Sequence, residues 1–129
     1  LPHLDEYIAA RQHAAAYYDK AFGNHEKIQI PPREERSTHV FHQYTLRLTG
    51  VDRDALREAL AAKEIPAMIY YPVPLHMQKA YQDPRYKEGD FPVAERLAAC
   101  VLSLPMHTEL DEEQLAYITQ AVLDFVNHC

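Results

Sequence analysis

The chain has 129 residues, of which 47% are hydrophobic and 25% charged, with three glycines and no tryptophan. This composition is typical of one globular domain and excludes disordered, collagen-like and low-complexity classes. Thirteen basic against nineteen acidic side chains give a net charge of -6, so the basic excess of a nucleic-acid-binding protein is missing. No apolar run reaches the ~20 residues needed to cross a bilayer, and we expect no membrane partner.

The first half of the chain alternates helical and extended patterns. Apolar residues at helical spacing predict a helix over residues 3–22, which Gly23 ends in a left-handed conformation. A short alternation predicts a strand over 27–30, ended by two prolines. Stricter alternation predicts the clearest strand over 39–48. Asp52 is then the expected N-cap of a second helix.

The second half contains shorter elements. In order, we expect a strand over 66–71, a short helix over 75–81, a helix from Pro92 to about Cys100, a strand over 101–104 and a last helix behind a capping box at Asp111. The element order is therefore α-β-β-α-β-α-β-α. It predicts an α+β fold, a small and mostly antiparallel sheet with helices packed on one face. Because there is no internal repeat and no flexible linker, residues 1–129 are expected to form a single domain.

Local catalytic signatures are missing. The eight histidines show neither HxH nor HExxH spacing, so we interpret them as structural or surface residues, with a metal-dependent hydrolase as a remote alternative. No GxSxG elbow surrounds a serine, and the isolated glycines form no phosphate-binding loop. Cys100 and Cys129 lack redox or zinc spacing and are expected to be free thiols in a reducing cytoplasm, with a single bridge as the alternative.

One segment differs from the rest of the chain. Between Tyr70 and Tyr81, three tyrosines, one histidine and two prolines occur within twelve residues. Tyrosine hydroxyls and an imidazole on a stiff strand exit suit a ligand that carries several hydroxyl groups. Packing of the same tyrosines at the edge of a core, with their hydroxyls in water, is the equally weighted alternative.

At this segment the chain resembles a known family. The string Tyr71-Pro72-Val73-Pro74-Leu75-His76-Met77-Gln78, with Tyr81 after it, resembles the C-terminal domain of the DegT/DnrJ/EryC1/StrS family of pyridoxal-phosphate-dependent sugar aminotransferases. The other stretches that agree in order and spacing are the first helix with Arg11 and Tyr17, and residues 39–44, 91–95, 102–107 and 110–114. The resemblance covers essentially the whole chain.

The resemblance implies a longer parent protein. Family members are roughly three times this length, as expected for a large domain plus a small one. Their large domain holds pyridoxal phosphate through a Schiff-base lysine and a phosphate cup. None of the five lysines here has that context, so we assign no catalytic or cofactor-binding residue and expect the isolated chain to be inactive. Since the chain opens on Leu1 rather than Met, we expect it to be a fragment whose N-terminal domain is absent.

The resemblance also implies a substrate site. By their positions in the family motif, Tyr71 and His76, followed by Tyr70 and Tyr81, are expected to bind a nucleotide sugar through hydrogen bonds and stacking. The parent would be a cytoplasmic homodimer that converts a nucleotide-linked keto-sugar to an amino-sugar, with glutamate as the usual amino donor. Its small domain would line the pocket and help to close the cleft.

Two alternatives and two departures from the family pattern accompany this prediction. The alternatives are a sugar dehydratase of the same family and a free-standing binding domain that kept the fold. Glu64 stands where many relatives have the glycine that suits a left-handed turn. Tyr70 stands where relatives that act on UDP-sugars often have histidine, which weakens any inference about the nucleotide.

Overall fold

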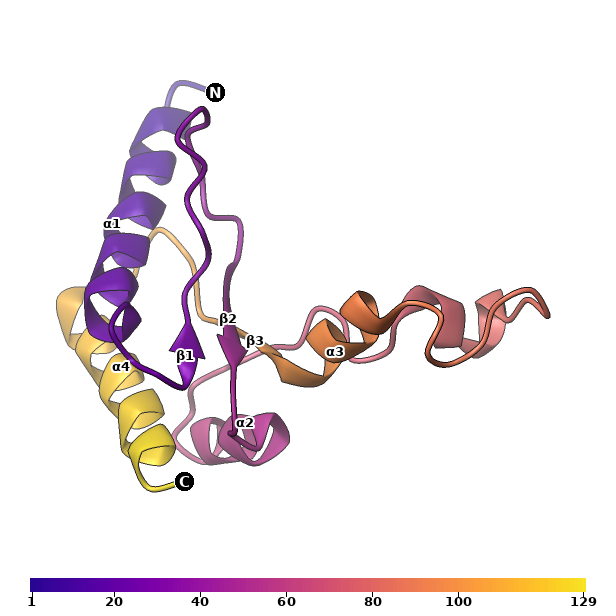
Figure 1. The fold of residues 1–129 in the computed structure, drawn as a ribbon. Coiled ribbons are helices and arrows are strands. Elements are labelled where there is room, and N and C mark those ends of the chain that lie inside the picture. The colour runs from indigo at the N-terminus through magenta and orange to yellow at the C-terminus, as the bar shows by residue number, and fades with distance from the viewer.

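A three-stranded antiparallel sheet forms the centre of the computed structural model, which describes residues 1–129 (Figure 1). Its strands, in spatial order, are β1 (Ile28–Gln29), β2 (Tyr44–Leu48) and β3 (Val101–Leu104). Thr45 of β2 lies opposite Ser103 of β3. The predicted α+β class with an antiparallel sheet is confirmed.

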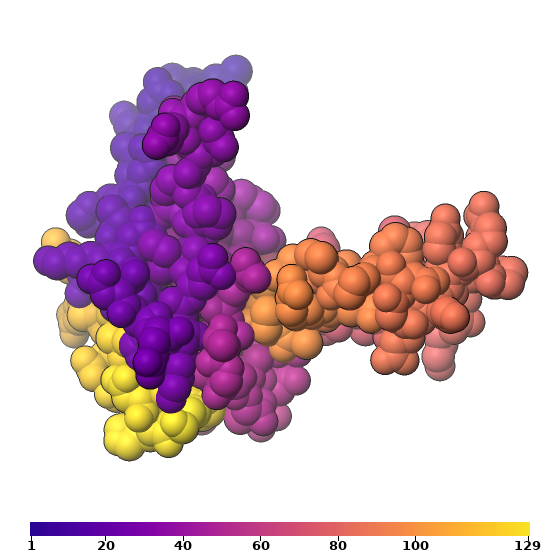
Figure 2. Space-filling model, in the orientation of Figure 1, coloured from indigo at the N-terminus to yellow at the C-terminus, as the bar shows by residue number.

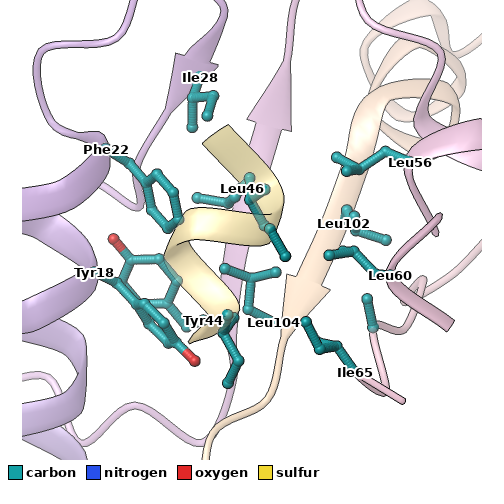
Figure 3. Close-up of a cluster of buried hydrophobic side chains, with 14 of the residues drawn as sticks. Tyr18, Phe22, Ile28, Tyr44, Leu46, Leu56, Leu60, Ile65, Leu102 and Leu104 are labelled. Carbon is teal, nitrogen blue, oxygen red and sulfur yellow. The ribbon is translucent and has the colours of Figure 1, made fainter. Parts of the chain in front are cut away.

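Three helices share one core with the sheet. They are α1 (Leu4–Phe22), α2 (Arg53–Ala61) and α4 (Glu112–Asn127). Alternate side chains of a strand point to the same face, and Tyr44, Leu46 and Leu48 of β2 are all buried in this core. In Figure 3, Tyr18 and Phe22 of α1 approach these strand residues from the helical side. None of the helices is both long and apolar enough to cross a membrane.

The remaining helix, α3 (Pro92–Cys100), belongs to an arm that projects from this body (Figures 1 and 2). We define the arm as residues 69–100. Its outgoing limb, residues 69–82, contains the 3₁₀ turns η1 (Leu75–Met77) and η2 (Lys79–Tyr81), and its returning limb, residues 83–100, ends with α3. No residue from Met68 to Leu97 is buried, so the arm has no apolar core of its own.

The starts of the helices follow from local capping. The Asp52 carboxylate accepts hydrogen bonds from two backbone N–H groups in the first turn of α2. Asp111 forms a capping box with Gln114 at the start of α4, and Pro92 occupies the first turn of α3, where a missing N–H costs nothing. All three predicted helix starts are confirmed, as are two free cysteines.

Three predicted strands are shorter in the structure, and the one over 27–30 is reduced to Ile28–Gln29. The strand predicted over 39–48 begins only at Tyr44, because Phe41 has a φ of 48° and interrupts the extended backbone. The strand predicted over 66–71 is reduced to a single bridge between Met68 and Ser103. Beyond Met68 the chain leaves the sheet toward Pro72, which has no N–H to donate to a neighbouring strand.

Two other local predictions are wrong. The helix predicted over 75–81 is two 3₁₀ turns separated by Gln78, whose ψ of 133° is extended. Gly23 does not adopt the left-handed conformation expected after α1, since its φ is -61°. Its N–H instead continues the helical pattern by donating to the carbonyl of Asp19 at 2.8 Å.

Glu64, by contrast, adopts the left-handed conformation, with a φ of 61°. A residue with a Cβ is strained there by about 1–2 kcal/mol, whereas glycine is not. Because glycine also loses more backbone entropy on folding, we expect Glu64→Gly to raise the free energy of unfolding by about 0.5–1 kcal/mol. Urea unfolding followed by circular dichroism measures this change.

Glu58→Gly is the matched control for Glu64→Gly. Glu58 is exposed like Glu64 but lies inside α2, where glycine lowers stability by about 1 kcal/mol. Equal loss of stability in both variants would show that the backbone at Glu64 carries no strain.

Candidate functional site

A hollow of about 530 Å³ lies where the arm meets the sheet. Thr45 reaches it from the face of β2 opposite the core residue Leu46, and its hydroxyl lies 2.7 Å from that of Ser103. The outgoing limb forms one wall, and Ala94 and Leu97 of α3 belong to the opposite wall. The hollow is therefore a junction of β2, the outgoing limb, α3 and Val101 at the start of β3.

Three of the four predicted site residues line this hollow: Tyr70, Tyr71 and Tyr81. The rings of Tyr70 and Tyr71 meet edge to face, with centroids 5.9 Å apart. All three side chains are exposed, and Tyr71 most of all at 72%. These aromatic faces and hydroxyls are consequently available to a ligand.

The fourth predicted residue, His76, lies in an adjoining hollow that it shares with Tyr81 and Phe91. Its side chain is only 9% exposed, and its ring lies against that of Phe91 with centroids 4.7 Å apart. His76 Nε2 is 3.0 Å from a carboxylate oxygen of Glu95. The structure therefore brings the three tyrosines together and directs the imidazole to a protein partner.

Glu95 is the charged residue near the hollow that the sequence prediction missed. Besides the His76 contact, its carboxylate accepts hydrogen bonds from the backbone N–H groups of Gly89 at 2.9 Å and Phe91 at 3.3 Å. Partial burial opposes the charge, but these three hydrogen bonds outweigh it and hold the pKa of Glu95 below its usual range. The only signal in the sequence is its place in the family-like stretch 91–95.

The walls of the hollow limit what it can do chemically. No Asp, Glu, Lys or Arg lines it, and its polar groups are the tyrosine hydroxyls, Thr45 and Gln78. Neutral hydroxyls and aromatic faces can hydrogen-bond and stack against a ligand. They supply neither a cation for a phosphate group nor a base near neutral pH, so the lining suits hydrogen bonding and stacking rather than catalysis.

The lysines do not form a cofactor site. No lysine lines the hollow, and the Lys27 ammonium instead donates to the carbonyl of Cys129 at 2.9 Å. A pyridoxal phosphate site needs a Schiff-base lysine together with groups that hold the ring and the phosphate. The residues of this chain do not fit that cofactor, and no group of three or more potential metal ligands comes together.

Comparison with known proteins assigns the fold to one family. Residues 1–123 match the model of the DegT/DnrJ/EryC1/StrS aminotransferase family. A pleiotropic regulatory protein of Geobacillus stearothermophilus is 42% identical over 98% of this chain and 34% of its own length. A UDP-N-acetyl-3-dehydro-alpha-D-glucosamine 3-aminotransferase of Acidithiobacillus ferrooxidans is 42% identical over 94% of this chain and 31% of its own length.

A solved structure agrees with these matches. The crystal structure of DesV from S. venezuelae superposes with a TM-score of 0.89 and 35% identity, over 96% of this chain and 33% of that protein. The chain thus spans about a third of the length of the relatives that it matches.

Proposed function

Because this chain belongs to the DegT/DnrJ/EryC1/StrS aminotransferase family, we propose that it is the small domain of an enzyme that converts a nucleotide-linked keto-sugar to an amino-sugar. The match of residues 1–123 to the family carries this proposal. The name of the Acidithiobacillus relative, which specifies a UDP-linked sugar, supports a nucleotide-sugar substrate. The length of the relatives supports a second domain outside this chain.

The small domain contributes binding surface and no reacting group. Tyr71, Tyr70 and Tyr81 stack against and hydrogen-bond to uncharged parts of the nucleotide sugar, because the hollow that they line contains no charged group. The negative charge of the diphosphate is held by residues outside this chain. His76 hydrogen-bonds to Glu95 and in this way helps to hold the wall of the site in place.

The cofactor and the partners of the complete enzyme follow from the same proposal. Pyridoxal phosphate, when bound, supplies the electron sink for amino-group transfer, and the residues that hold it lie outside this chain. Glutamate is the proposed amino donor, and a homodimer is the proposed assembly.

The reading frame upstream of the Leu1 codon tests the two-domain proposal. Since the chain corresponds to 34% of the length of the Geobacillus relative, about 250 further residues with a Schiff-base lysine are expected there. A start codon immediately before Leu1 would reject the proposal in favour of a free-standing binding domain. An upstream domain without the lysine would favour the dehydratase alternative.

Activity is the second test of the proposed function. The protein expressed from the complete reading frame is expected to aminate a nucleotide-linked keto-sugar with glutamate, as followed by mass spectrometry of the sugar. The 129-residue chain alone is expected to show no turnover, because it lacks a lysine in a binding site. A measurable rate from the isolated chain would contradict the assignment of its role.

A further inference from the structure

The arm is held together without a core. Because no residue from Met68 to Leu97 is buried, hydrophobic packing contributes less to the distance between its two limbs than it does to the body of the domain. Where burial is small, local order depends on the few specific contacts that remain.

One hydrogen bond joins the outgoing limb to the returning limb, and it is the bond between His76 and Glu95. The other hydrogen bonds of the outgoing limb are local, such as that from the Gln78 amide to the carbonyl of Val73. Those of the returning limb lie within that limb, such as the pair formed by Arg85 and Asp83, except that the carbonyl of Ala98 accepts from Arg53 of α2 at 3.0 Å. The contact of His76 with Glu95 therefore links the two limbs of the arm.

The same carboxylate also organises the start of α3. By accepting from the N–H groups of Gly89 and Phe91, Glu95 fixes the turn that delivers the chain into the helix. The Phe91 ring, held by this turn, then lies against His76. One side chain thus ties together η1, the 89–91 turn and α3.

The hydrogen bond between His76 and Glu95, which fastens the two limbs, also affects the walls of the hollow. Leu75, which precedes His76 on η1, lines one wall, and Ala94, which precedes Glu95 on α3, lines the opposite wall. The residues on either side of the hydrogen bond therefore face each other across the hollow. The length of the hydrogen bond between His76 and Glu95 therefore sets the separation of the two walls near Leu75 and Ala94.

We propose that Glu95 is a positioning residue of the nucleotide-sugar site, which holds the two walls of the hollow at their working separation through His76 and the 89–91 turn. It does not touch the ligand. The inference rests on the proposed function for the identity of the ligand, whereas the fastening of the arm by Glu95 is tested without any ligand.

The fastening is tested by NMR on the 129-residue chain. Nuclear Overhauser contacts between the rings of His76 and Phe91 are expected in the wild type and lost in Glu95→Ala. Glu88→Ala is the matched control, because Glu88 lies in the same limb and lines a hollow with His76, yet its carboxylate makes none of the bonds described for Glu95. Contacts that persist in Glu95→Ala, or that vanish equally in Glu88→Ala, would overturn the fastening.

Glu95→Gln adds rescue by a conservative variant, a readout that a general loss of stability does not produce. Its side-chain oxygen can still accept from the N–H groups of Gly89 and Phe91, and its amide can hydrogen-bond to the imidazole. The ring contacts are therefore expected to be kept in Glu95→Gln and lost in Glu95→Ala. Their loss in both variants would contradict a role for these hydrogen bonds.

The consequence for the ligand is tested on the protein from the complete reading frame. UDP-N-acetylglucosamine and dTDP-glucose serve as probes in calorimetric titrations. Glu95→Ala is expected to raise the dissociation constant of the bound probe roughly tenfold, equivalent to about 1.4 kcal/mol, with Glu88→Ala unchanged and Glu95→Gln near wild type. Wild-type affinity in Glu95→Ala despite lost ring contacts would overturn the positioning role, whereas binding of neither probe by the wild type would count against the proposed function alone.

Discussion

Leu46→Ala is expected to lower the free energy of unfolding by about 2–5 kcal/mol, the range for truncating a buried leucine. Leu46 lies in the middle of the central strand β2 and is fully buried. Figure 3 shows it among the side chains that join the sheet to the helices. Removing its isobutyl group leaves a cavity that neither the sheet nor α1 and α4 can fill without moving. Urea unfolding followed by circular dichroism measures the loss.

Leu75→Ala is the matched control for the core prediction. Leu75 is 63% exposed and lies on the arm, so the same truncation there is expected to change stability by no more than about 0.5 kcal/mol. The contrast between the two variants separates the body, which is held by burial, from the arm, which is held by polar contacts. Equal losses in both variants would contradict this division of the molecule.

The parts of the fold that could be predicted from the sequence depend on neighbours along the chain. The buried face of β2 follows from the alternation of Tyr44, Leu46 and Leu48. The caps at Asp52 and Asp111 bond to residues two or three positions further on. Such patterns involve only residues a few positions apart, so they can be recognised before any tertiary contact is known.

The late start of the strand predicted over 39–48 has a long-range cause. The Arg11 guanidinium donates to the carbonyls of Phe41 at 3.1 Å and His42 at 3.3 Å, and to that of Met106 at 3.2 Å. One cation from α1 thus gathers carbonyls from two distant loops, and Phe41 takes a positive φ in this arrangement. Alternation alone predicts a strand here because it contains no information about a partner thirty residues away.

The candidate site likewise has a part that could be predicted from the sequence and a part that could not. Tyr70 and Tyr71 are adjacent, and Tyr81 follows within the same short segment, so their common location could be predicted. Glu95 lies nineteen positions after His76, and no periodic pattern connects the two. Their contact depends on the reversal of the arm between the limbs, so it could not be predicted from the sequence.

In the protein from the complete reading frame, Tyr71→Ala is expected to weaken binding of a nucleotide sugar more than any other single change in the hollow. Tyr71 is the most exposed of the three tyrosines that line the hollow, so its ring offers the largest free surface. Loss of one aromatic stacking partner costs about 1–3 kcal/mol, and 1.4 kcal/mol corresponds to a tenfold change in affinity. The dissociation constant for UDP-N-acetylglucosamine or dTDP-glucose is therefore expected to rise roughly tenfold or more.

Two further variants separate the contributions of the Tyr71 side chain. Tyr71→Phe keeps the ring and removes only the hydroxyl, so its expected loss is about 0.5–1.5 kcal/mol, the value of one hydrogen bond. Tyr7→Ala removes an equally large, 51% exposed tyrosine from α1, remote from the arm, and is expected to leave the affinity unchanged. The absorbance of the cofactor is expected to stay the same in all three variants, since no residue of the hollow fits a cofactor site. Wild-type affinity in Tyr71→Ala, or a loss of cofactor absorbance with it, would place the nucleotide-sugar site elsewhere.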